Sequence, residues 1–185
     1  MDEGQLVRTK GINGVSYSAV SAAKFVAAAG TAPFFSLYGS AAKGAVLEIL
    51  KVTVSGAVAT AAVYGDLILS KRTVAISGGT ADTIVPTPLN TRSPASGATN
   101  VKQYTAAPTA GTGGGVVAGA LVFVPLLGTV VNNNGPWQFE FGLHDEQQPL
   151  QLRGTGEGIE LSWATTLGNA TTTMVSVDYR EYTEV

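Results

Sequence analysis

Hydrophobic and polar residues alternate most regularly near the C-terminus of the chain. Ile159, Leu161 and Trp163 alternate there with Glu160 and Ser162. Because successive side chains of a strand point to opposite faces, this pattern predicts a β-strand. The three apolar side chains are expected to face a core, and Glu160 and Ser162 are expected to face solvent.

A second alternating segment follows, in which Val175, Val177 and Tyr179 are separated by polar residues. The run Thr171–Thr173 before it is β-branched, which suits a pleated and half-buried surface. Between the two segments, Leu167–Asn169 contains residues that tolerate a positive φ angle. The pattern therefore predicts two antiparallel strands joined as a hairpin or lying as near neighbours.

Further strand signals recur at short spacing through the rest of the chain, separated by glycine, proline and asparagine. Strands are predicted at or within Phe34–Tyr38, Leu50–Val54, Val58–Tyr64, Leu67–Leu69, Thr73–Ile76, Thr83–Val85, Val101–Thr105, Val116–Val124, Trp137–Phe141 and Leu150–Leu152. Gly78-Gly79 marks a turn, Asn90–Asn100 a long connection and Ala110–Gly115 the tip between two strands. The type of the alanine-rich segment Ser16–Ala29 stays open.

Many short strands with little convincing helix predict an all-β fold, built as a two-sheet antiparallel β-sandwich or a barrel. Long connections between distant strands favour a jelly roll. Residues 1–15 are polar and glycine-containing, which is typical of an extended arm or a loosely ordered terminus. We therefore expect an N-terminal arm and first segment at 1–33 and a single jelly-roll β-sandwich domain at 34–185.

Charge is sparse in this chain. Charged residues make up 13% of the sequence, against about 25% in ordinary soluble domains, and mean hydropathy is +0.23. This composition favours a subunit that buries surface in an assembly, although abundant Thr, Ser and Asn offer another way to hydrate the surface. The net charge of −2 and the scattered basic residues lack the clustered Lys and Arg of a nucleic-acid binder.

Cysteine is absent, which excludes a disulfide framework, a thiolate metal site and a cysteine nucleophile. It also suits a protein made in a reducing cytoplasm. Met1 is followed by Asp2 and Glu3, so no secretory signal is expected. Residues 103–139 carry no charge, but Pro125 and two glycines interrupt the apolar run, so no membrane span is predicted. Leu121–Val124 is instead expected to be a buried strand.

The sequence contains few candidates for catalytic or metal-binding residues. His144 is the sole histidine and is followed by Asp145 and Glu146. The chain has no second His or Cys to complete a set of metal ligands, which favours a solvated loop. Gly111–Gly119 lacks the Gly-Lys-Ser/Thr ending of a phosphate-binding loop. Glu157 and Glu160 are three residues apart in an extended segment, which points them to opposite sides rather than into a glycosidase pair. No catalytic, cofactor-binding or metal residue is therefore predicted, and binding residues stay unknown.

Two tryptophans and one acceptor sequence for glycosylation are the remaining candidates for a functional role. Trp137 and Trp163 occupy strand positions that are expected to face the core rather than to stack on sugars. Asn169-Ala170-Thr171 matches the acceptor sequence for N-glycosylation, which has no meaning without secretion.

Several segments of the chain resemble structural proteins of tailed bacteriophages. The segments share short apolar runs and glycines and are spread over most of the chain. They are Phe34–Ser40, Glu48–Val52, Arg92–Ala95, Tyr104–Gly111, Pro149–Gly154 and Gly156–Ile159. The resemblance implies a virion component, a jelly-roll capsid decoration or cement protein that binds the outer surface of the major capsid protein lattice and stabilises it.

The same resemblance implies a homotrimer on the capsid surface, made in the host cytoplasm. We expect a non-enzymatic protein whose partners are the major capsid protein and itself, with no cofactor, nucleic acid or membrane. Self-association is expected to bury part of residues 103–139, and the arm Met1–Val15 to reach a neighbour. The alternative is a carbohydrate-binding or host-attachment module of a phage tail appendage, with an exposed aromatic in Asn132–Trp137. A hydrolase would need clustered carboxylates, which the sequence does not suggest.

Overall fold

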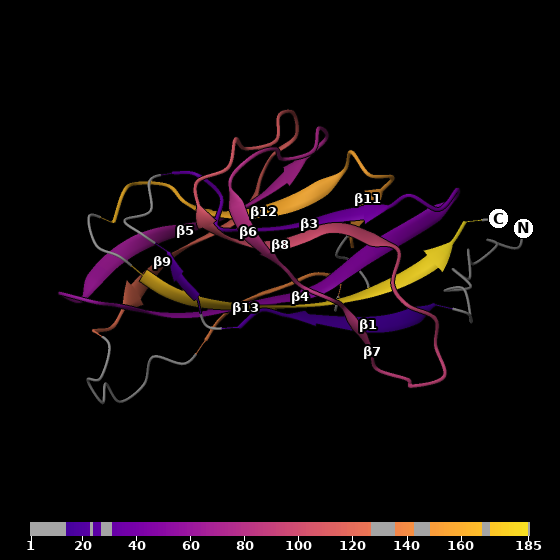
Figure 1. The fold of residues 1–185 in the computed structure, drawn as a ribbon, viewed down its shortest axis with the longest axis horizontal. Coiled ribbons are helices and arrows are strands. Elements are labelled where there is room, and N and C mark those ends of the chain that lie inside the picture. The colour runs from indigo at the N-terminus through magenta and orange to yellow at the C-terminus, as the bar shows by residue number, and fades with distance from the viewer. Residues whose placement is uncertain are drawn as a thin grey trace, which may run out of the picture.

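The computed structural model describes residues 14–22, 24–26, 31–126, 136–142, 149–167 and 171–184. These residues form β-strands, turns and loops, with no helix among them. The strands make two antiparallel sheets that pack against each other (Figure 1). The prediction of an all-β, two-sheet antiparallel sandwich is confirmed.

The larger sheet has seven strands. Its main order is β10-β4-β13-β1-β7, while β11 also pairs with β4 and β2 with β13. These strands are β1 (Val15–Val20), β2 (Lys24–Val26), β4 (Ala45–Val58), β7 (Thr87–Pro88), β10 (Trp137–Glu140), β11 (Leu150–Arg153) and β13 (Thr171–Thr183). β1 and β2 come from the segment 1–33 and both pair with β13, so part of that segment lies within the sandwich.

The smaller sheet has six strands in the order β6-β8-β3-β12-β5-β9. These are β3 (Phe35–Ser40), β5 (Val63–Arg72), β6 (Thr80–Thr83), β8 (Ala98–Ala106), β9 (Gly115–Val124) and β12 (Gly158–Trp163). All their pairings are antiparallel. β9 and β6 therefore form the two edges of this sheet.

The connectivity is that of a jelly roll. One sheet contains the order β1-β13-β4 followed by β10 and β11, and the other contains β3-β12-β5-β9. Successive main strands of the chain thus exchange sheets, except for β5 and β9, which pair within the smaller sheet, and β10 and β11, which both pair with β4. Strands β6 to β8 are inserted between β5 and β9, and β8 extends the smaller sheet beyond β3. The predicted jelly roll is confirmed.

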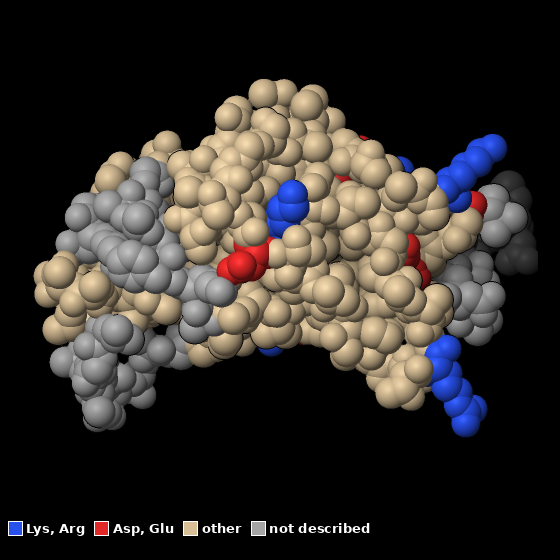
Figure 2. Space-filling model, viewed as in Figure 1, with Lys and Arg blue, Asp and Glu red and all other residues tan. Residues whose placement is uncertain are grey.

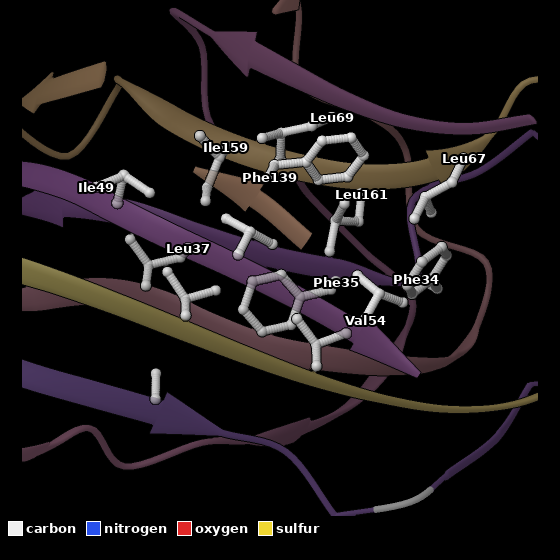
Figure 3. Packing of buried hydrophobic residues seen from close by; sticks show 14 of the residues in the cluster. Phe34, Phe35, Leu37, Ile49, Val54, Leu67, Leu69, Phe139, Ile159 and Leu161 are labelled. Carbon is white, nitrogen blue, oxygen red and sulfur yellow. The ribbon is translucent and has the colours of Figure 1, made fainter. Parts of the chain in front are cut away.

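The core lies between the two sheets. Figure 3 shows Leu37, Ile159 and Leu161 of the smaller sheet meeting Ile49 and Val54 of the larger one. All five side chains are fully buried. Burial of one such side chain stabilises a fold by about 1.5–3 kcal/mol, so this interface is the main source of cohesion between the sheets.

The predicted hairpin between the two C-terminal alternating segments is wrong. β12 pairs with β3 and β5 in the smaller sheet, whereas β13 pairs with β4, β1 and β2 in the larger one. In a jelly roll the last connection crosses between the layers, so consecutive strands face each other across the core instead of sharing hydrogen bonds. The alternation was nevertheless assigned correctly in β13, where Val175, Val177 and Tyr179 are buried.

The expectation that Glu160 faces solvent is also wrong, because both faces of β12 are covered. Glu160 is 1% exposed. Residues inserted between β5 and β9 lie over the outer face at this point, where Ile76 and Tyr104 form a small cluster with Tyr38. A local pattern of alternation contains no information about such a distant covering segment.

Several strand predictions need new boundaries, including Thr83–Val85, because β6 covers Thr80–Thr83. The predicted strand Val58–Tyr64 spans a turn, since β4 ends at Val58 and β5 begins at Val63. Lys71 and Arg72 belong to β5 instead of ending it, and Thr73–Ile76 lies outside the named strands. In β4 a bulge at Leu50 shifts the register, so Ile49 is buried and Leu50 is half-buried.

Candidate functional site

Several predicted positions fall outside the described residues. These include the arm up to residue 13, His144 with its acidic neighbours, and Asn169-Ala170 of the glycosylation sequence. Within the described ranges, no group of three or more His, Asp or Glu side chains is placed to hold a metal ion. The same ranges contain no helix long and apolar enough to cross a membrane.

Glu157 and Glu160 belong to different environments. Glu157 forms an ion pair with Lys71, 3.2 Å between Oε2 and Nζ, and accepts a hydrogen bond from the Arg153 backbone. Glu160 instead accepts hydrogen bonds from Tyr38 and Arg72, so the two carboxylates have separate partners. They do not form a glycosidase pair.

Glu160 is held by three donors. The Tyr38 phenol donates to Oε1 over 2.5 Å, and the Gly111 backbone N–H donates to the same oxygen over 2.9 Å. The Arg72 guanidinium donates to Oε2 over 3.1 Å. Buried carboxylates require this kind of compensation for their lost hydration. Glu160 therefore fastens the segment around Gly111 to the smaller sheet, and both of its carboxylate oxygens accept hydrogen bonds from the chain itself.

The phenols beside this carboxylate are kept neutral. Burial raises the pKa of Tyr38 well above its ordinary value, and its hydrogen bond to Glu160 raises that pKa further. Burial also raises the pKa of Tyr104, whose hydroxyl lies 3.4 Å from Ser36 Oγ. Neutral phenols act as hydrogen-bond donors here, which fits a structural network.

The glycine-rich segment 111–119 consists of a strand connection, residues 111–114, and the first half of β9. Gly113 and Gly114 have positive φ angles of 73° and 69°, which only glycine adopts without strain. Gly111 is already engaged by the chain's own Glu160. No helix follows the segment to provide the N-terminus that a phosphate-binding loop requires.

The tryptophans lie toward the core, as predicted. Trp163 is buried and its ring lies 5.7 Å from that of Phe34, in a stacked arrangement. Trp137 in β10 is half-buried and packs against the core cluster. Neither forms an exposed platform on which a sugar ring stacks.

A shallow depression of about 490 Å³ opens where residues 40–46 face residues 153–155 and Glu184. Arg153 and Glu184 cross it as an ion pair of 2.7 Å, and both side chains are about half exposed. Their hydrogen bond raises the pKa of Arg153 and lowers that of Glu184. This ion pair therefore joins two of the charged side chains at the depression, which Lys43 also lines.

Exposed apolar side chains gather on β9 and the adjacent part of β5. Leu121 is 71% exposed and Val116 63% exposed. The exposed ring of Tyr64, on β5, lies 5.2 Å from that of Phe123. We call Val116, Val117, Leu121 and Phe123, together with Tyr64, the β9 surface.

The expectation that Leu121–Val124 is a buried strand is wrong in part. Val122 and Val124 face the core and are buried, whereas Leu121 points outward and is exposed. The reason is that β9 lies at the edge of the sheet and one of its faces is uncovered. The uncharged stretch 103–139 includes this exposed part of β9, but composition alone does not reveal which side chains are exposed.

The surface around β9 is poor in charge. Two charged residues of β5 pair with β9: Asp66 lies opposite Leu121, and Lys71 lies opposite Gly115 at the far end. In Figure 2, the visible charged side chains lie mostly near the centre of the face and toward the end that carries the C-terminus. Most of the remaining described surface in that view is uncharged.

β9 differs from the other described edge strands in length and composition. β7 has two residues including Pro88, and β6 has four including Asp82. β10 and β11 have four each, with Glu140 and Arg153. Short length, proline and charge are features that keep a sheet edge from pairing with another chain. β9 has ten residues with no charge and no proline.

Comparison with known proteins gave no match to a family model, a curated protein or a solved structure. Function is therefore inferred from the jelly roll and from the β9 surface.

Proposed function

We propose that this chain is a non-enzymatic structural protein of a virion, a decoration or cement protein that binds the outer surface of the major capsid protein lattice. The observation that supports this function best is a jelly roll that exposes a long, uncharged edge strand. Jelly rolls are frequent in viral capsid proteins, and unguarded edges and apolar patches serve association.

The site geometry is in keeping with this proposal. The carboxylate with the most elaborate surroundings, Glu160, is occupied by three donors of the chain itself. Two of the charged side chains that line the open depression, Arg153 and Glu184, pair with each other. Surfaces available for contact are therefore more prominent in the described structure than any arrangement of reactive groups.

Low charge matters for this role because decoration proteins of this kind are proposed to cover seams between neighbouring capsid subunits. An uncharged contact surface carries a small desolvation cost compared with a charged one. Self-association, expected as a homotrimer, adds further contacts to the lattice and increases the stability of attachment through multivalency.

The test is binding to empty shells assembled from the major capsid protein encoded in the same genome. Saturable co-sedimentation and a higher temperature of shell disruption are expected. An unrelated acidic jelly-roll protein of similar size is the control. A genome that encodes no capsid protein, or shells that leave the chain in the supernatant, contradicts the proposal, and binding to a glycan array instead supports the host-attachment alternative.

A further inference from the structure

We propose that β9 pairs in antiparallel fashion with β9 of a second copy of this chain, across a two-fold axis that joins the two smaller sheets edge to edge. The inference rests on the self-association part of the proposed function and does not require capsid binding. It names the strand, the partner and the symmetry of one contact.

The first argument is the open edge itself. Along its full length β9 pairs with β5 on one side, and no described residue pairs with it on the other. An edge strand presents a row of backbone N–H and C=O groups, and a second strand satisfies them. The one bulge, at Val117, lies near the start of β9 and leaves the stretch from Ala118 to Val124 regular.

The composition of β9 favours a second copy of the same strand as the partner at its free edge. Like charges placed opposite each other destabilise a strand pair, and a strand that carries charge is therefore a poor partner for itself. β9 carries none, and its outward side chains Val117, Leu121 and Phe123 are apolar. Two copies of this strand meet without repulsion and bury apolar side chains against each other.

The third argument is room for a neighbouring backbone. The middle of β9 reads Ala118-Gly119-Ala120, so large side chains are absent there. A Cβ added at Gly119 meets only the Leu67 carbonyl oxygen, at 3.6 Å, which is ordinary contact. Glycine inside a strand often marks a place where another backbone approaches closely.

Symmetry restricts the register. In an antiparallel pair, residues directly opposite each other are either both hydrogen-bonded or both not hydrogen-bonded. Two identical strands related by a two-fold axis therefore place one residue opposite itself. We expect that residue to lie within residues 117–121, because the overlap of the two strands is greatest with Gly119 or Ala120 opposite itself and decreases on either side.

The contact is modest in size. Ten residues of strand span roughly 33 Å, which places the contact near the small end of specific interfaces. Dissociation constants in the micromolar range are therefore expected for the free protein. Copies held side by side on a shell have a higher effective concentration, so the same contact becomes occupied there.

A cysteine scan tests the pairing directly, because the chain has no cysteine of its own. Single cysteines are placed at each position from 117 to 121 and oxidised under mild conditions. One position is expected to give a covalent dimer in high yield, since directly opposed Cβ atoms come within disulfide range. Gln138→Cys, on the exposed edge strand β10, is the matched control and is expected to stay uncoupled. The absence of a preferred position from 117 to 121 overturns the proposal.

Charge placed on the β9 surface tests the same contact without a cross-link. The double variant Val117→Lys and Leu121→Lys is expected to raise the dissociation constant about tenfold or more. The matched control is Val85→Lys with Leu89→Lys, because these two side chains are also apolar and exposed but lie outside β9. The control is expected to associate like the wild type.

Mass measurement separates this inference from the rest of the proposed function. Sedimentation equilibrium up to about 200 µM, well above a micromolar dissociation constant, is expected to detect dimers, or hexamers where two-fold pairing joins two trimers. A monomer or an isolated trimer over this range overturns β9 pairing. A protein that dimerises through β9 but does not bind shells leaves this inference standing and contradicts the capsid function.

Discussion

The phenol of Tyr38 in β3 donates a hydrogen bond of 2.5 Å to the carboxylate of Glu160 in β12, the neighbouring strand of the smaller sheet. The same phenol accepts a hydrogen bond from the Ile76 backbone over 3.0 Å. Tyr38 therefore links the sheet to the segment inserted after β5. Glu160 links the sheet to Gly111 at the other end of that insertion, so the pair ties both ends of the insertion to the jelly roll.

Removal of the Glu160 charge is expected to destabilise the protein. Glu160→Gln weakens three hydrogen bonds and leaves the Arg72 guanidinium without its partner, which predicts a loss of about 2–4 kcal/mol in the free energy of unfolding. Urea denaturation followed by circular dichroism measures the loss. Glu157→Gln removes the more exposed ion pair with Lys71 and is expected to cost about 1 kcal/mol or less. Equal effects of the two substitutions contradict the assigned role of Glu160.

Alkaline pH is expected to destabilise the fold through its buried phenols. Burial raises the pKa of Tyr38 and of Tyr179 in the folded state above the ordinary value of 10.0. Their stabilising contribution is therefore fully present below pH 10 and is lost as pH rises toward the folded-state pKa values. Each phenol lowers the free energy of unfolding by about 1.4 kcal/mol per pH unit in that window.

Urea unfolding at pH 8, 10 and 11 tests this dependence. Tyr179→Phe is expected to reduce the slope above pH 10, although it also removes the hydrogen bond to Ser96. That loss changes stability at every pH and does not alter the slope. A free energy of unfolding that stays constant from pH 8 to pH 11 contradicts the prediction.

Alternation along the sequence predicted which faces of many strands are buried, but it did not predict strand partners. Val175, Val177 and Tyr179 were assigned correctly because their faces follow from the two-residue period. The same period does not indicate which strands pair with each other. A hairpin of β12 and β13 was therefore predicted, although these strands lie in opposite sheets. The jelly roll was predictable from long connections, whereas this pairing depends on contacts between distant residues.

The features of the candidate site were only partly predictable for the same reason. Glu160 has the position of a solvent-facing residue in its strand, and it becomes buried because a segment many residues earlier covers it. Leu121 is apolar, as a core residue is expected to be, and it is exposed because the face of β9 that carries it is uncovered. The absence of charge in residues 103–139 was the available signal, and the exposed side chains of β9 lie within that range.

Two glycine-to-alanine substitutions compare a closely packed glycine with one that has free space around it. Gly39→Ala in β3 places a Cβ against the Gly154 carbonyl oxygen, a backbone atom that cannot rotate away. We expect a loss of about 1–3 kcal/mol in the free energy of unfolding. Gly115→Ala in β9 meets no atom within 4 Å and is expected to be neutral or to stabilise by up to about 1 kcal/mol. Thermal unfolding of both variants measures the contrast, and a reversed order contradicts the packing described around β3.

The physical nature of β9 pairing predicts how it responds to temperature and salt. Apolar burial weakens on cooling, so the dissociation constant is expected to be larger at 5 °C than at 25 °C. Because β9 carries no charge, an increase from about 0.05 to 0.5 M NaCl is expected to leave the dissociation constant within about twofold or to lower it. Asp66 lies near Leu121, so the Asp66 carboxylates of two paired copies repel each other. Screening of this repulsion by salt also favours association. The control with Val85→Lys and Leu89→Lys is expected to show the same dependences as the wild type. Association that weakens tenfold with added salt identifies an electrostatic interface elsewhere on the molecule and excludes β9 as its main contact.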